Sequence, residues 1–337
     1  MRLLRYTLRR LIFVIPVLLG ALFIAFALTR IVPGNPIERV AGPYTSNERV
    51  EEMKREAGLL DPFYVQFYDY IGDVLQGDLG QSYQTNQAVT KDLWDRLPAS
   101  LELVLYGMTL AVLLALPLGI ISAVKRGRPV DHVARVLSVI GVSAPIFWIG
   151  MLLLSTFYIR LGWAPGPVGR LPMMASSPDR VTGLYTIDAL LNGDFGTFRM
   201  AGEALVLPVL TIALVAMAPI ARMTRAMMID ALESDYIRTA RSMGLPSRVI
   251  VLHHAFKNAF IPVLTLIAAV FGFAIGGEVL VEFIFTWPGL GLYSLNAIQG
   301  SDFPAIQGFI ILVTAIYLLI YLVVDIITAM LDPRVEF

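Results

Sequence analysis

The sequence predicts an all-α integral membrane protein with six transmembrane helices. Three observations indicate this class: 57% of the residues are hydrophobic, only 15% are charged, and the mean hydropathy is +0.71. A soluble domain normally carries a much larger share of charged residues. The 26 basic and 26 acidic residues give a net charge of zero, so no overall field favours a nucleic acid as partner. The expected environment is therefore the lipid bilayer.

Six apolar stretches are long enough to cross a bilayer as helices. A hydrocarbon core about 30 Å thick needs roughly 20 helical residues, because every backbone amide must be paired within the segment. The stretches contain no Asp, Glu, Lys or Arg, and they cover residues 11–29, 103–124, 136–159, 204–221, 258–277 and 303–324. The fourth is the shortest and contains Pro208 and Pro219, which membrane helices tolerate.

Basic residues near the span ends predict the orientation, because Lys and Arg concentrate in cytoplasmic loops. They cluster before the first span, after the second and after the fourth: Arg2, Arg5, Arg9, Arg10, Lys125, Arg126, Arg128, Arg135, Arg222, Arg225, Arg238, Arg241, Arg248 and Lys257. We expect these three places, and therefore both chain termini, to lie in the cytoplasm.

The chain is expected to have three parts. Residues 1–31 form a cytoplasmic N-terminus and the first helix, residues 32–101 form a small extracytoplasmic segment, and residues 102–337 form the core with the other five helices. The second part has the composition of a small soluble unit and an acidic bias. It is interpreted as a structural cap, with a docking surface or an extracellular gate as the alternative.

The residue pattern of an enzyme is missing. No G-x-x-x-x-G-K-[ST] phosphate loop occurs, so ATP is not expected to bind by that route. The chain has no cysteine, and His253 and His254 are adjacent without the spacing of a zinc site. No nucleophile motif is present either. We therefore expect no catalytic residue, no cofactor and no metal in this chain.

Acidic residues inside membrane helices are candidates for function because they are costly to bury in lipid. Asp325, which is followed by the apolar residues 326–330, is the clearest one, with Glu278 and Glu282 at the outer edge of the fifth span. Asp325 is interpreted either as a group that handles protons or solute, or as a structural partner of a basic residue near the inner surface.

The longest cytoplasmic segment, about residues 226–257, predicts a helix, a sharp turn and a second helix. Residues 226–243 are compatible with one continuous helix that ends at Gly244, and Pro246 suits the first turn of the next helix. A solvated polar hairpin would explain the charges. It would also leave apolar side chains in water unless a partner protein covers them; these are Ile237, Met243, Leu245, Val249, Val251 and Leu252.

This segment resembles the cytoplasmic loop of permease subunits from binding-protein-dependent ABC importers. The resemblance rests on Asp235-Tyr236-Ile237-Arg238-Thr239-Ala240-Arg241, then Gly244, then His254-Ala255-Phe256-Lys257-Asn258-Ala259 and Pro262. The general family pattern is E-A-A, three residues, then Gly. Arg238, Thr239 and Ala240 occupy the E-A-A positions, so any contact ascribed to that glutamate is in doubt here.

Further motifs extend the resemblance along the chain and narrow it to the dipeptide, oligopeptide and nickel branch. In order, they are Pro33-Gly34-Asn35-Pro36, Gly77-Asp78-Leu79-Gly80 with Ser82, Arg222-Met223-Thr224-Arg225, Trp287-Pro288-Gly289-Leu290-Gly291, Asp302-Phe303-Pro304 and Asp332-Pro333-Arg334. The pattern is most similar to dipeptide permeases, while glutathione, oligopeptide and nickel permeases share most of it.

The resemblance implies a transporter with this subunit, a homologous second permease, two ATPase subunits that bind ATP and Mg²⁺, and an external peptide-binding protein. It implies that Asp235 to Gly244 dock on an ATPase subunit, with Ile237, Thr239, Ala240 and Met243 as buried contacts. A proton-coupled secondary transporter and a passive channel or structural subunit are the alternatives. The former would need an ion or proton site and inverted repeats.

Overall fold

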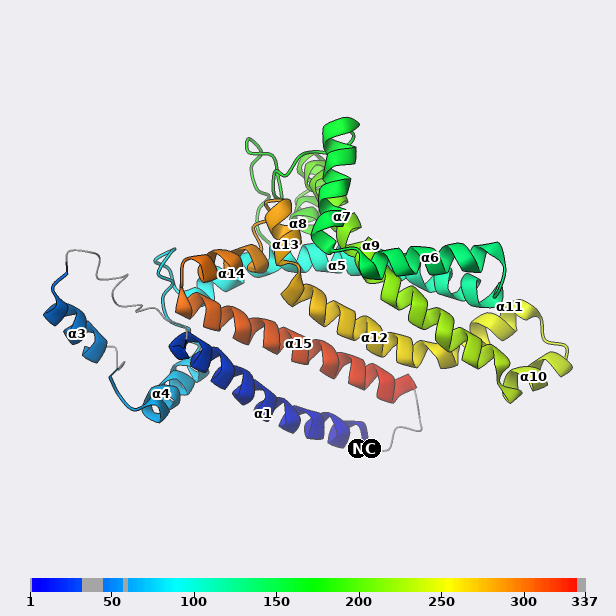
Figure 1. The fold of residues 1–337 in the computed structure, drawn as a ribbon, viewed down its shortest axis with the longest axis horizontal. Helices are drawn as coiled ribbons and strands as arrows, with labels where there is room; N and C mark the ends of the chain where they lie inside the picture. The colour runs from blue at the N-terminus through cyan, green and yellow to red at the C-terminus, as the bar shows by residue number, and fades with distance from the viewer. Residues whose placement is uncertain (1, 32–44, 57–59, 332–337) are drawn as a thin grey trace.

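The computed structural model describes residues 2–31, 45–56 and 60–331 (Figure 1). The sequence motifs at residues 33–36 and 332–334 lie outside these ranges. The described residues form helices, with one isolated β-bridge between Gln81 and Ala88 and no strand.

The helices lie mostly along one common direction, with α3 at one end of the molecule and α10 at the other (Figure 1). In chain order they are α1 (Arg2–Ile31), α3 (Asn47–Glu56), α4 (Phe63–Leu75), α5 (Val89–Val124), α6 (Pro129–Ser143), α7 (Ile146–Leu153), the π-helical segment η1 (Leu154–Arg160), α8 (Tyr185–Leu191), α9 (Phe195–Glu233), α10 (Asp235–Ser242), α11 (Ser247–Val249), the π-helical segment η2 (Ile250–Ala255), α12 (Phe256–Gly277), α13 (Val279–Ile284), α14 (Leu290–Gln299) and α15 (Phe303–Leu331).

The predicted class, an all-α integral membrane protein, is confirmed. Four of the described helical segments are long and apolar enough to span a bilayer: Val89–Val124, Phe195–Glu233, Ser247–Gly277 and Phe303–Met330. The pair Pro129–Ser143 and Ile146–Arg160 provides a fifth candidate, and α1 contains the shorter apolar stretch Ile12–Leu28. The total of six spans stays a prediction.

The third predicted span is not one continuous helix. Its two halves, α6 and the segment formed by α7 and η1, meet at an angle of 106°. The break is at Ala144, whose φ of −79° and ψ of 127° are extended. Pro145 follows directly, and a proline disfavours the helical conformation of the residue before it. The signal for the break was therefore present in the sequence.

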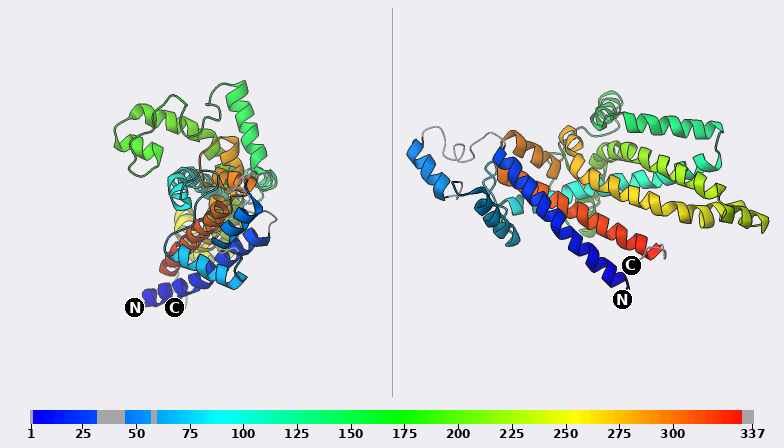
Figure 2. Two further views of the ribbon diagram at one scale, coloured as in Figure 1. Left: turned by 90° about the vertical axis from the view of Figure 1, so that its left-hand side faces the viewer. Right: turned by 60° about the horizontal axis from the view of Figure 1, so that its bottom comes forward.

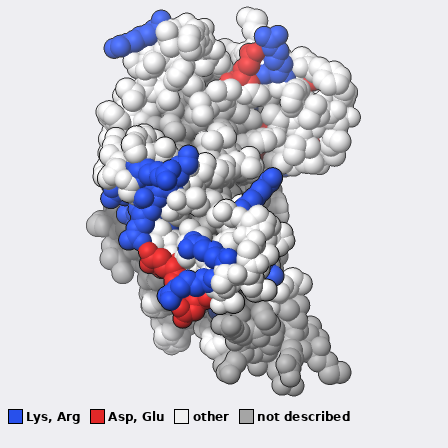
Figure 3. Space-filling view, turned by 90° about the vertical axis from the view of Figure 1, so that its right-hand side faces the viewer, with Lys and Arg blue, Asp and Glu red and all other residues white. Residues whose placement is uncertain are grey.

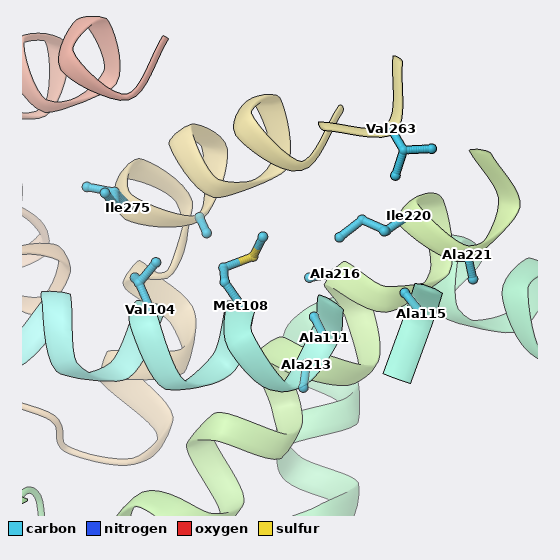
Figure 4. Packing of buried hydrophobic residues seen from close by; sticks show 11 residues of the cluster. Val104, Met108, Ala111, Ala115, Ala213, Ala216, Ile220, Ala221, Val263 and Ile275 are labelled. Carbon is cyan, nitrogen blue, oxygen red and sulfur yellow. The ribbon is translucent and has the colours of Figure 1, made fainter. Parts of the chain in front are cut away.

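The centre of the molecule is the packing of α5 against α9, with α12 alongside (Figure 4). Buried Val104, Met108 and Ala111 of α5 meet Ala216 and Ile220 of α9. The two backbones approach closely at Gly119, where an added Cβ would lie 2.6 Å from Cβ of Thr224. Small residues permit such contact between membrane helices, and the contact is stabilised by dispersion forces.

Helices α1 and α15 run antiparallel along one side of this centre (Figure 2). Phe23 and Phe26 of α1 contact rings of α4, with ring centroids of Phe26 and Phe67 5.4 Å apart. Part of the segment 32–101 thus packs on α1. Tyr68, which is 77% exposed, points away from this contact.

Candidate functional site

The segment between α9 and α12 forms a helical hairpin at one end of the molecule (Figure 1). Helix α10 ends at Ser242, Met243 follows it, and Gly244 then has a φ of 77°. This left-handed conformation suits glycine, which lacks the Cβ that clashes there. Pro246 then precedes α11. The sharp turn at Gly244 is therefore present where the sequence places it, between two helical segments.

The prediction of one helix over residues 226–243 was wrong, because the helix breaks at Ser234. The ψ of this residue is 156°, which is extended. Its Oγ donates a hydrogen bond to the carbonyl of Ala231 at 2.5 Å, so the side chain competes with the backbone ladder. The second predicted helix also differs, since residues 250–255 form the π-helical segment η2. The break makes α10 a separate short helix.

Helix α10 has one buried face and one exposed face. Ile237 is fully buried and Ala240 is 7% exposed, because they pack with Met228, Ala255 and other apolar residues of α9, η2 and α12. Beside this buried face, Tyr236 is 42% exposed, and Met243, which follows the last residue of α10, is 73% exposed. Ile237 and Ala240 therefore anchor α10 to its own chain, while their predicted contact with a partner stays a prediction.

The remaining residues of the predicted docking element are exposed. Asp235, Arg238, Thr239 and Gly244 lie on the surface, and Arg238 forms an exposed ion pair with Asp235 at 3.1 Å. Lys and Arg gather on the end of the molecule that carries α10 and α11 (Figure 3). The exposed surface of the hairpin is thus a mixture of apolar side chains and positive charge.

A buried carboxylate holds α5, α6 and α9 together close to this hairpin. Asp131 is 1% exposed. Arg225 of α9 donates to it from Nε at 2.6 Å and from Nη2 at 3.0 Å, while Ser122 Oγ donates at 2.7 Å and the Gly127 amide at 2.9 Å. The sequence analysis did not single out Asp131. The basic clusters around it were a signal that a nearby acid would be paired.

Asp325 lies at the contact of α15 with α1. Its Oδ2 is 3.1 Å from Nε of Arg10, and the two side chains are 27% and 48% exposed. This geometry fits the structural alternative, a partner of a basic residue, rather than a group inside a solute pathway.

If the chain is the permease that its sequence resembles, replacing Asp325 with asparagine is expected to leave ATP-driven uptake intact, because a partly exposed ion pair contributes only about 0–1 kcal/mol. The measurement is solute uptake by the reconstituted assembly with and without ATP. Uptake that falls away while losing its ATP requirement would instead support the proton-coupled alternative.

Buried polar groups also fix the segment between η1 and α9 on α5. Glu102, which is 1% exposed, accepts from Arg170 Nη2 at 2.6 Å and from Thr186 Oγ1 at 2.7 Å. Arg170 lies over the ring of Tyr185 at 3.5 Å. Burial raises the pKa of Asp188, but hydrogen bonds from Thr182 and Gly183 outweigh burial and leave this pKa below its usual value. Residues 170–188 are therefore held in place by charge and hydrogen bonding.

A groove of about 520 Å³ lies between α6, α7, α9 and α12. Its walls are small and apolar, and Glu278 is its one charged lining residue. The neighbouring Glu282 points elsewhere: it accepts hydrogen bonds from Ser100 Oγ at 2.5 Å and from the Leu292 amide at 2.8 Å. The two acids at the outer edge of the fifth span thus have different surroundings.

The described part of the chain contains no group of three His, Cys, Asp or Glu residues that could hold a metal ion. His254 is partly buried in η2 and His253 is exposed. An apolar groove, closely packed membrane helices and an exposed helical hairpin are features of a membrane permease. The fold and the site define a protein of this class.

The comparisons with known proteins agree. Residues 115–337 match the family "Binding-protein-dependent transport system inner membrane component", and residues 3–104 match the N-terminal part of such membrane components. The chain belongs to this family of transport permease subunits.

Several relatives match over nearly their whole length. A probable D,D-dipeptide transport system permease protein of Escherichia coli K12 is 42% identical over 95% of this chain and 94% of its own. A dipeptide transport system permease protein of Alkalihalophilus pseudofirmus is 37% identical over 99% of this chain and 100% of its own. A glutathione transport system permease protein of Escherichia coli O6:H1 is 34% identical over 99% of both chains.

Proposed function

We propose that this chain forms the passage for dipeptides or short peptides in an ATP-driven importer. The dipeptide relatives support the substrate class. ATP and Mg²⁺ would bind to separate ATPase subunits, because the chain carries no phosphate loop. The subunit itself would have no ATPase site and no catalytic role.

The proposed assembly pairs this subunit with a homologous second permease, two ATPase subunits and an extracytoplasmic peptide-binding protein. It lies in the bacterial cytoplasmic membrane with both termini inside. The three parts of the chain, residues 1–31, 32–101 and 102–337, would then be the first span, an external cap and the core. The segment of about residues 226–257 transmits movement from the ATPase subunits.

The observation that carries this proposal is the exposed face of α10. Tyr236 and Met243 are large side chains left uncovered on a short helix whose other face is fully packed. Exposed apolar side chains on a helix anchored in this way are typical of a protein interface. Arg238, Thr239 and Gly244 complete that surface, and Asp235 begins it.

A single cysteine at position 243 is expected to cross-link to an ATPase subunit. The chain has no cysteine of its own, so Met243→Cys introduces one thiol, and a short thiol-to-amine reagent then captures a nearby lysine. Mass spectrometry of the adduct from the assembled transporter identifies the partner.

Met173→Cys is the matched control, because Met173 is a fully exposed methionine between η1 and α8. In the proposed orientation, this loop lies on the extracytoplasmic side. It is expected to give no adduct with an ATPase subunit. An ATPase adduct from position 173, or none from position 243, would contradict the proposed docking surface and orientation.

Glutathione is the second candidate substrate, because a glutathione permease is 34% identical over nearly the full length. Competition of unlabelled glutathione against uptake of a labelled dipeptide separates the two. A dipeptide permease is expected to keep its uptake in the presence of excess glutathione.

A further inference from the structure

Glu278 differs from the other buried acids of the described chain. It is 5% exposed, and neither of its carboxylate oxygens has a hydrogen-bond partner among the described residues. The other buried carboxylates in that part of the chain all accept hydrogen bonds, as Asp131 does from Arg225 and Glu102 does from Arg170. A buried ionisable group without a partner is costly. A partner from outside the chain would remove this cost.

The groove beside Glu278 has the size and the walls of a site for a small ligand. Its volume of about 520 Å³ lies within the roughly 300–1,000 Å³ of small-molecule sites. Val142, Ile146 and Val215 line it, and so does Phe273, which is 77% exposed. No Lys, Arg or His lines the groove. Among its lining groups, the carboxylate of Glu278 alone favours a cation.

The chemistry of peptides matches this arrangement. Free peptides differ in their side chains but share an α-ammonium group, and a carboxylate is the natural partner of an ammonium in a site of low polarity. Apolar walls without other charges accept different side chains. We propose that Glu278 binds the α-ammonium group of the transported peptide in this groove. This inference rests on the proposed function and names the group that the site recognises.

The position of Glu278 fits a role in binding the incoming peptide. Glu278 follows the last residue of α12. In the proposed orientation, this end of α12 lies on the extracytoplasmic side. A peptide released by the binding protein would meet it early. The groove has no basic side chain that could pair with the peptide carboxylate. The C-terminal end of the peptide would therefore face the second permease. The site would therefore be completed by both subunits.

The test compares ligands on the wild-type transporter, assembled from both permeases and the ATPase subunits but without the binding protein. Binding of alanyl-alanine, its C-terminal amide and its N-acetyl derivative is measured by saturation-transfer NMR. The first two are expected to bind, and acetylation is expected to weaken binding at least about tenfold, because it removes the charge that pairs with the buried acid. Equal binding of the free and acetylated peptides would overturn the inference.

Glu278→Gln is the matching variant, since it keeps the size of the side chain and removes the charge. It is expected to bind the free and the acetylated peptide equally weakly, with the second permease still copurified. Glu203→Gln is the control, because Glu203 is an exposed acid that pairs with Arg199. It should keep the wild-type preference. A Glu278→Gln subunit that keeps this preference would overturn the inference.

Two further outcomes are distinguishable. If the second permease no longer copurifies with the Glu278→Gln subunit, Glu278 forms an ion pair with a basic side chain of that permease. This result would also overturn the inference. ATP-driven uptake of alanyl-alanine by the complete wild-type transporter tests the proposed function separately. If the transporter takes up alanyl-alanine but binds the free and the acetylated peptide equally, the proposed function stands and only the role of Glu278 is overturned.

Discussion

Replacing Gly244 with valine is expected to uncouple peptide uptake from ATP hydrolysis while the subunit still inserts into the membrane. Gly244 has a φ of 77°, and a side chain with Cβ costs about 1–2 kcal/mol in this left-handed conformation. A Cβ at this position would meet no atom within 4 Å. The effect therefore arises from backbone strain at the turn between α10 and α11, and relief of the strain would move α10 relative to the membrane helices.

The measurement compares the rates of uptake and ATP hydrolysis in reconstituted liposomes. We expect uptake per ATP to fall strongly and the amount of assembled transporter to stay unchanged. Gly193→Val is the matched control: Gly193 has a φ of 70°, and its Cβ would also meet no atom within 4 Å. It lies between α8 and α9, far from the hairpin along the chain. Equal damage from both variants would show that general strain, rather than the hairpin, is responsible.

Hydropathy was a good guide to the membrane helices but not to their full extent. The second predicted span, residues 103–124, is the apolar end of α5, which begins at Val89. The fourth, residues 204–221, is the middle of α9 (Phe195–Glu233). The extensions carry polar residues that pack on other parts of the chain. A hydropathy scale measures how readily side chains transfer from water into the bilayer. It carries no information on helical hydrogen bonds, so the predicted span ends where the apolar residues end.

Of the two helix breaks, at Ala144 and at Ser234, only the first could be predicted from the neighbouring residues. The break at Ala144 follows from Pro145 through a steric rule, and it could have been predicted. Ser234 gives no comparable signal, because serine is also found within helices. The break between α9 and α10 depends on how α10 packs. Ile237 and Ala240 were named as contacts of an ATPase subunit because the resemblance implies them. Their burial against α9 and η2 depends on how the hairpin folds back, which the sequence does not specify.

Buried acids were the least predictable part of the site. Glu278 and Asp325 stood out because they flank or interrupt apolar stretches. Asp131 lies among basic residues at the start of α6, where an acid is usually solvated. Its burial requires α6 and α9 to converge on the end of α5, a contact between residues 94 positions apart in sequence. Such a contact is determined by tertiary packing.

Removing the Asp131 carboxylate is expected to destabilise the chain much more than removing one partner of an exposed ion pair. In Asp131→Ala the guanidinium of Arg225, the Ser122 hydroxyl and the Gly127 amide lose their shared acceptor. Breaking a buried pair from one side costs about 3–5 kcal/mol. Because the Arg225 side chain is 22% exposed, the lower end of that range applies. The midpoint of thermal unfolding of the purified subunit should fall by several degrees.

Glu233→Ala provides the comparison, because Glu233 pairs with Arg126 at the same end of the molecule while both side chains are more than half exposed. An exposed pair contributes about 0–1 kcal/mol, so this variant should unfold close to the wild-type midpoint. Adding Arg225→Ala to Asp131→Ala should recover part of the loss, since no uncompensated charge then remains. Equal midpoints for Asp131→Ala and Glu233→Ala would mean that Asp131 does not hold α6 to α9, and the hairpin would have to be positioned by its apolar face alone.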